Sequence, residues 1–175
     1  MCRSVIAEIS DLNQQLVDLL DDEDAAPHLG PPCTPAQIDA VRREFARFVQ
    51  GIPPSYLEFL ELHDGWTGIL GDIRMLTVTE RSATWMLDIA QATLEWLDDD
   101  DPFASMVAIE ADPSTGSYLA FLDPRTARES GEMDVVVYVH FEVEMRVGSF
   151  LDYLADRAEM LRQVIDDQLN GDLES

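Results

Sequence analysis

The sequence contains no lysine, because all eleven of its basic residues are arginine. Schiff-base catalysis needs an ε-amine, and a phosphate-binding loop of the Walker type needs a lysine that reaches the phosphates. Both kinds of site are therefore excluded. Gly65, Gly68 and Gly71 stand three residues apart, but this is not the spacing of a dinucleotide-binding fingerprint. These glycines therefore predict a loop and not a nucleotide site.

Cysteine and long apolar runs are also scarce. Cys2 and Cys33 are the only cysteines, which is typical of a reducing compartment and provides no disulfide framework. No apolar run approaches the ~20 residues that a membrane-spanning helix needs. The first ten residues lack the apolar core of a secretory signal. We therefore expect a cytoplasmic protein that does not enter a membrane.

Positive charge is the third shortage. The 35 acidic residues outnumber the 11 basic ones, which gives a net charge of −24. A surface of this kind repels nucleic acid and anionic membranes and accelerates encounters with basic partners. Solubility, or adaptation to a salt-rich host, would explain the same composition. The charge thus indicates a basic protein as the partner, while the solubility explanation stays open.

The most informative stretch covers residues 51–66, GIPPSYLEFLELHDGW. Its two prolines end the preceding helix and suit the first turn of a new one. The Asp64-Gly65 pair predicts the turn that follows, because glycine reaches positive φ without steric cost. Between them, bulky side chains recur at helical spacing on one face: Tyr56, Phe59, Leu60 and His63. We expect this short helix to form the centre of the core.

The chain before this stretch predicts two more helices. Residues 4–20 have an apolar stripe at helical spacing, which indicates a helix that packs on the domain, or alternatively one that binds a partner. Residues 21–32, acidic and then rich in proline and glycine, predict a linker. Thr34 and Gln37 fit a capping box for a second helix that turns Ile38, Val41, Phe45 and Phe48 inward. We therefore divide the chain into an N-terminal helix with linker, 1–33, and a domain, 34–175.

The second half of the chain predicts a sheet enclosed by helices. A strand is expected at 73–78 and a helix at 82–97, followed by the acidic run Asp98, Asp99, Asp100 and Asp101. Apolar, β-branched segments at 105–109, 118–122 and 135–141 predict an antiparallel meander, and 141–147 alternates as a half-exposed strand does. Ser149 then caps a closing helix whose inner face is Phe150, Tyr153, Leu154, Leu161 and Ile165.

This order of elements resembles the SUKH superfamily, which contains yeast cell-wall-synthesis regulators and many bacterial toxin-immunity proteins. The resemblance covers about residues 34–155. It departs from the family pattern at Asp64, where asparagine is usual, at Trp66, where a second glycine is frequent, and at Phe141, which intervenes before Glu142. The N-terminal helix has no counterpart. The matching positions are Ile38, Glu44, Ile52, Pro53, Tyr56, Phe59, Leu60, Gly65, the segment 118–123, Val137, Tyr138, His140, Glu142, Ser149, Phe150, Tyr153 and Leu154.

The resemblance implies an α+β domain with a mostly antiparallel sheet flanked by helices. It also implies a binder, which neutralises a cognate toxin of the nuclease or deaminase type, and not an enzyme. A regulatory or scaffold module of the same fold is the alternative. Together with the charge, the resemblance to immunity proteins points to a set of docking residues, in which an exposed tryptophan ringed by acids would anchor a partner arginine: Asp64, Trp66, Asp72, Glu95, Asp98, Asp99, Asp100 and Asp101. Alternatively, Trp66 is a lid on the core and the aspartates are merely solvated.

The third hypothesis is that the protein is an enzyme, and few residues in the sequence support it. Glu142 and Glu144 alternate on one strand and could form an acid/base pair, but no nucleophile or metal cluster accompanies them. The histidines and Cys33 lack the spacing of a zinc site. His63 and His140 are expected to be core histidines with satisfied hydrogen bonds. We therefore expect no cofactor, no metal and no catalysis, and the sequence leaves the oligomeric state open.

Overall fold

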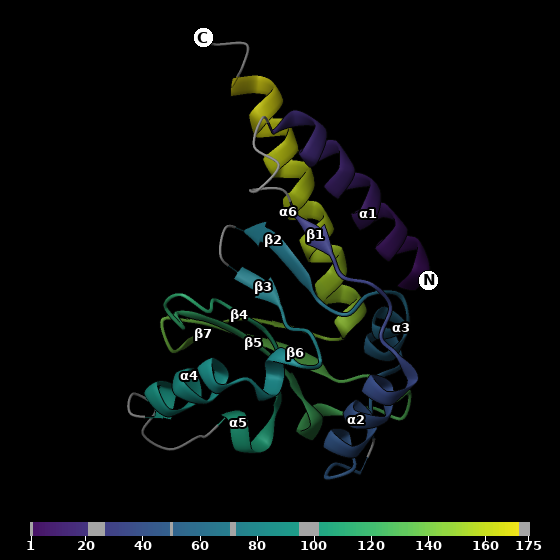
Figure 1. Cartoon of the computed structure of the whole chain (residues 1–175), viewed down its shortest axis with the longest axis vertical. Helices are drawn as coiled ribbons and strands as arrows, with labels where there is room; N and C mark the ends of the chain where they lie inside the picture. The colour runs from purple at the N-terminus through teal and green to yellow at the C-terminus, as the bar shows by residue number, and fades with distance from the viewer. Residues whose placement is uncertain (1, 21–26, 50, 71–72, 95–101, 172–175) are drawn as a thin grey trace.

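The computed structural model describes residues 2–20, 27–49, 51–70, 73–94 and 102–171 of the chain. One antiparallel sheet of seven strands follows the order of the sequence, from β1 at one edge to β7 at the other (Figure 1). The predicted α+β class with an antiparallel sheet flanked by helices is confirmed. The strands are β1 (His28–Leu29), β2 (Trp66–Leu70), β3 (Ile73–Met75), β4 (Val107–Ala111), β5 (Tyr118–Asp123), β6 (Asp134–Val139) and β7 (Glu142–Val147).

The middle of the sheet is buried on both faces. Every residue of β5 is buried, and its side chains alternate between two hydrophobic clusters. Ala120 and Leu122 join the larger cluster, whereas Leu119 and Phe121 join the smaller one. A strand covered on both faces needs a continuous apolar run, which is what the sequence YLAFLD provides. Helices therefore cover both faces of this sheet.

Each cluster recruits its own helices. The larger cluster receives α1 (Cys2–Leu19), α2 (Pro35–Phe45), α3 (Pro54–Leu62) and α6 (Phe150–Gly171). The smaller one receives α4 (Thr84–Leu94) and α5 (Pro102–Ser105), on the opposite side of the sheet (Figure 1). Two 3₁₀ turns, η2 (Glu80–Ser82) and η3 (Pro124–Thr126), complete the described elements. The predicted central helix is confirmed, because Tyr56, Phe59 and Leu60 of α3 are almost completely buried.

Helix boundaries follow the signals in the sequence. The Thr34 hydroxyl accepts a hydrogen bond from the Gln37 backbone, and the Gln37 side chain reaches back, so that the predicted capping box forms. Ser149 caps α6 in the predicted way, since its hydroxyl accepts the backbone N–H of Asp152 at 3.0 Å. Gly65 has φ of +87°, which confirms the predicted turn. These local predictions succeeded because caps and turns depend on few neighbours.

The N-terminal helix is part of the main core. In Figure 1, α1 and α6 lie side by side and run in the same direction beyond the sheet. Ile9 and Leu16 of α1 share the larger cluster with Leu161 and Ile165 of α6. The predicted packing of this helix on the domain is thus confirmed, and residue 33 does not mark a break in the hydrophobic core. Asn13, also buried here, has no hydrogen-bond partner for its amide among the described residues.

Three local predictions were wrong. Residues 28–29, predicted as linker, pair with β2, and residues 66–70, predicted as a glycine-rich loop, form β2 itself. Gly30 explains the first error: a Cβ there would lie 2.2 Å from the Asp64 carbonyl oxygen, so only glycine lets these two segments approach. The third error concerns His140, which is exposed in a turn and not buried in a strand.

Candidate functional site

Of the predicted docking residues, Trp66 and Asp64 lie among the described residues, and both are buried. Trp66 is completely buried in β2, so its prediction as an exposed anchor was wrong. Its side chain belongs to the larger cluster, which also contains residues of α1 and α6. Asp64 is only 8% exposed. Asp72, Glu95, Asp98, Asp99, Asp100 and Asp101 lie outside the described residues.

Asp64 has a structural role instead. One carboxylate oxygen accepts the Val78 backbone N–H at 2.7 Å, and the other accepts the Gln37 side-chain amide at 2.5 Å. The carboxylate therefore joins α2, the turn after α3 and the segment after β3. A carboxylate that is used in this way has little capacity left for a partner. Sequence reasoning missed this, because the two donors lie 14 and 27 residues away.

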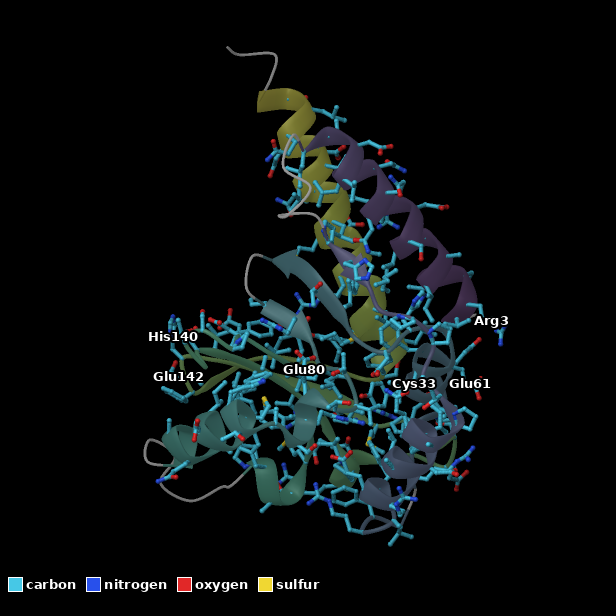
Figure 2. All side chains as sticks on the ribbon, viewed as in Figure 1. Arg3, Cys33, Glu61, Glu80, His140 and Glu142 are labelled. Atoms are coloured by element: carbon cyan, nitrogen blue, oxygen red, sulfur yellow. The ribbon has the colours of Figure 1, made fainter. Side chains whose placement is uncertain are left out.

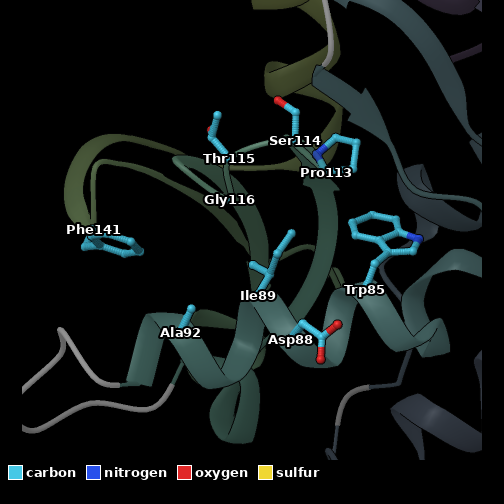
Figure 3. A pocket seen from close by; sticks show the side chains of 9 residues that line it. All are labelled: Trp85, Asp88, Ile89, Ala92, Pro113, Ser114, Thr115, Gly116 and Phe141. Carbon is cyan, nitrogen blue, oxygen red and sulfur yellow. The ribbon is translucent and has the colours of Figure 1, made fainter.

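A groove on the other side of the sheet is the better candidate. It has a volume of about 300 Å³ and lies between α4, the β4–β5 turn and the β6–β7 turn (Figure 3). Its walls are largely apolar, with one exposed carboxylate. The lining residues are Trp85, Asp88, Ile89, Ala92, Pro113, Ser114, Thr115, Gly116 and Phe141.

Helix α4 forms the floor. Trp85, Ile89 and Ala92 recur at i, i+4 and i+7, so they lie on one face of the helix. These residues belong to the helix that the sequence predicts at 82–97, but the sequence did not predict the groove above them. Ile89 and Trp85 are only partly buried, because the two turns above them leave a space. Asp88 lies beside Trp85 on the same helix and is exposed (Figure 3).

The β4–β5 turn is held by one carboxylate. Asp112 accepts hydrogen bonds from the backbone N–H of Ser114 at 2.8 Å and of Thr115 at 3.2 Å, and from both hydroxyl groups. Burial disfavours the charged form, but these hydrogen bonds outweigh it and lower the pKa of Asp112 to about 2. Gly116 completes the turn with φ of +65°, and a Cβ there would press on Ile89 at 3.3 Å. The turn therefore sits directly against α4.

The β6–β7 turn carries unusual backbone angles. Val139 pairs with Glu142, so His140 and Phe141 alone form the turn, with φ of +49° and +68°. Two-residue hairpin turns of this kind normally use Asn-Gly, since side chains are disfavoured at positive φ. The strain amounts to about 1–2 kcal/mol per residue. In this conformation of the turn, the Phe141 ring lines the groove. His140 and Glu142 lie at the edge of the molecule (Figure 2).

Charge distinguishes the groove from the rest of the surface only in part. Among the described residues, nine of the eleven arginines pair with a carboxylate, the exceptions being Arg43 and Arg47. No arginine lines the groove. The exposed carboxylates without an arginine partner are spread over several described elements, so acids alone select no face: Asp11, Asp18, Glu61, Asp88, Glu129, Glu142, Glu144, Asp152, Asp156, Asp166 and Asp167.

The most heavily buried charges form a structural network, not a reactive site. Arg157 of α6 donates to the hydroxyl groups of Tyr118 and Tyr153, and Tyr153 donates to Glu110 of β4. The Arg157 guanidinium lies 3.8 Å from the Glu110 carboxylate, and both side chains are at most 5% exposed. Burial, and then the Glu110 charge, raise the pKa of Tyr118 above its usual value. No lining of a described cavity includes these residues.

Among the described residues, those considered for metal binding do not form a cluster of three potential ligands. Glu142 and Glu144 are both exposed on β7. His63 is half-buried and its Nδ1 lies 3.0 Å from the Gly30 carbonyl oxygen, so its prediction as a satisfied histidine is confirmed. Burial raises the pKa of the Cys33 thiol to about 12, which removes its nucleophilic form at neutral pH. Within the described ranges, no three potential metal ligands lie together.

The chain matches no known protein family, and no curated protein sequence is significantly similar to it. None of the helices in the described part of the chain combines the length and apolar character that crossing a membrane requires. We therefore base the proposed function on the groove between α4 and the two turns.

Proposed function

We propose that the protein is a SUKH-type immunity protein that binds and neutralises a basic bacterial toxin domain through this groove. The observation that carries the proposal is the lining: aromatic rings of Trp85 and Phe141, a carboxylate at Asp88, and no arginine. An arginine or lysine side chain of the partner fits this chemistry, because its stem packs on apolar walls and its charge meets a ring face or a carboxylate.

The whole-molecule charge supports the same partner. Nuclease-type toxins need basic surfaces to hold phosphates, and a net charge of −24 attracts such a surface over long distances. Steering of this kind raises association rates to about 10⁸–10⁹ M⁻¹s⁻¹ at low salt. A protein that must intercept a toxin before it acts benefits from that rate. Attraction brings the partner near, and the groove supplies the anchor.

Backbone strain also supports a docking role for the hairpin turn. A residue with a side chain at positive φ costs stability, and two consecutive ones persist only where the surroundings enforce them. Here the strained residues are His140, which is exposed, and Phe141, which forms a wall of the groove. A sequence selected for stability alone would place asparagine and glycine in this turn.

The experiment pairs the purified chain with the basic domain that the neighbouring gene encodes. We expect a 1:1 complex whose association rate falls steeply between low and high salt, and loss of the domain's activity on binding. The variant Phe141→Gly should weaken the complex, while Asp11→Asn, which alters an exposed aspartate on α1, should leave it unchanged. Absence of a complex, or a complex indifferent to Phe141, would refute the proposal in favour of a regulatory module.

A further inference from the structure

A second hollow lies on the opposite side of α4, around Arg81 of η2. The Arg81 side chain is 5% exposed. Its Nη1 donates to the Tyr56 hydroxyl at 2.9 Å, but Nε and Nη2 are buried and have no hydrogen-bond partner among the described residues. The nearest carboxylate oxygen, Oε2 of Glu44, is 3.6 Å from Nη2, which is too far for a hydrogen bond.

The two unpartnered donors form one edge of the guanidinium group. Nε–H and Nη2–H point in parallel, so this edge can donate to both oxygens of a carboxylate at once. Leaving buried donors of a charged group unpaired is unfavourable, because they have lost their hydrogen bonds to water without gaining others. The other arginine that is buried to this degree, Arg157, directs its Nη2 to two tyrosine hydroxyl groups and lines none of the described cavities. Arg81 is thus the one that also lines a cavity, although its two spare donors are themselves covered from solvent.

Two cavities adjoin Arg81, and both are lined by Arg81 and Glu44. One, of about 350 Å³, opens between α2 and η2. The other, of about 190 Å³, has the volume of roughly six liquid water molecules at ~30 Å³ each. Its remaining walls are mainly apolar, with Met86, Phe103 and Met106 among them, and Arg47 adds a second guanidinium.

Among the described residues, the local charge here is opposite to that of the molecule. Of these residues, Arg47 and Arg81 line the smaller cavity together with a single carboxylate, that of Glu44. Arg47 has no carboxylate partner among the described residues, and its Nη2 donates to the Met106 carbonyl oxygen at 3.1 Å. Glu44 is one-third exposed, so its side chain can turn toward solvent and release the Arg81 edge. An anion therefore meets two positive charges and one movable negative charge.

We propose that the smaller cavity, called the cleft below, binds a small carboxylic acid with an apolar body. The ligand carboxylate pairs with the Nε–Nη2 edge of Arg81 and with Arg47, and its apolar part packs against Met86, Phe103 and Met106. Glu44 competes with the ligand for Arg81, so that it acts as an internal placeholder. This site is independent of the proposed docking groove, which lies across α4 and shares none of these residues.

Calorimetric titration of the full chain with three six-carbon probes tests the site. Sodium hexanoate, hexanol and hexylammonium chloride share one apolar body and differ only in the head group. At matched ionic strength we expect hexanoate to bind 1:1, hexanol at least about tenfold more weakly, and hexylammonium more weakly still. Equal binding of hexanol and hexanoate, tighter binding of hexylammonium, or no hexanoate binding would each overturn the proposal.

Variants then assign the head group to its residues. Arg47→Gln should weaken hexanoate roughly tenfold, whereas Glu44→Gln should strengthen it because the competitor loses its charge. Arg43→Gln, an exposed arginine of α2 that does not line the cleft, is the matched control and should change nothing. Arg81→Met should abolish binding, and if that variant does not fold, the opposite signs at Arg47 and Glu44 still decide. Weaker binding in Glu44→Gln would contradict the assignment.

Discussion

Helix α4 separates two hollows of opposite character. Trp85 and Ile89 face a groove that no arginine lines, whereas Met86 and Ala90 face a cleft that contains two. Both belong to one chain of net charge −24. The net charge of the chain acts on an approaching partner over distances up to the Debye length of about 8–10 Å. Which ligand a hollow binds depends instead on the side chains that line it. One molecule can therefore attract a basic protein and still hold an anion.

The largest expected effect concerns the aromatic wall of the groove. Phe141→Gly removes the ring and suits the positive φ of its position, so the turn should keep its shape. We expect the affinity for the basic partner to fall by about 2 kcal/mol or more, roughly thirtyfold, as for a central anchor. Hexanoate binding at the cleft should stay unchanged. Calorimetric titration with the basic partner and with hexanoate measures both affinities. An equal loss of affinity for the two ligands would contradict the independence of the groove and the cleft.

Reversing the charge of the groove should make it resemble the cleft. Asp88→Arg places a guanidinium beside Trp85, and we expect the association rate with the basic partner to fall about tenfold at low salt. The difference should almost vanish at 1 M salt, where the Debye length is about 3 Å. Stopped-flow kinetics over a range of salt concentrations provides the measurement. Asp18→Arg, an exposed site on α1, is the control and should slow association less.

Relieving the strain in the hairpin turn should separate stability from binding. His140→Gly removes the side chain from an exposed residue at φ of +49°, and we expect the free energy of unfolding to rise by about 0.5–1 kcal/mol. Because Phe141 remains, the affinity for the basic partner should change little. Urea unfolding of the variant and the parent protein gives the difference. A less stable variant would show that the His140 side chain stabilises the turn.

The last prediction concerns the pH dependence of the β4–β5 turn. The folded-state pKa of Asp112 is lowered to about 2 from an ordinary 3.8, so its contribution to stability is present above pH 4 and is lost as the pH falls toward 2. Asp112→Asn should flatten this part of the stability profile. Urea midpoints of both proteins between pH 5 and pH 2 measure it. Parallel profiles would mean that the turn does not depend on the charged carboxylate.

Features that depend on near neighbours could be predicted from the sequence. The capping box at Thr34, the cap at Ser149, the amphipathic α1 and the doubly buried β5 all follow from residues within one or two turns. Strand β2 could not be predicted, because Gly68 within it lowers strand propensity and the strand depends on pairing with β1 and β3. That omission also left Trp66 exposed in the predicted loop.

The candidate site was predicted only in fragments. The helix that carries Trp85, Ile89 and Ala92 was predicted at 82–97, and residues 112–116 fall between two predicted strands. These residues line one groove because of the register of β4 with β5 and because of the hairpin that carries Phe141. Phe141 lies some 50 residues after Ile89 in the sequence, so their contact with the same groove is not visible in a local pattern. The buried pair of Glu110 and Arg157 was missed for the same reason, since β4 and α6 lie far apart in the sequence.

One measurement tests the central claim most directly. The ¹⁵N-labelled chain is titrated with the basic domain, and the indole signal of Trp85 and the amide signals of Asp88 and Thr115 are followed by NMR. Our account predicts that these signals shift first and most strongly, while those of Arg47 and Arg81 stay in place. Shifts centred on α2 and η2, with the Trp85 indole unchanged, would contradict it.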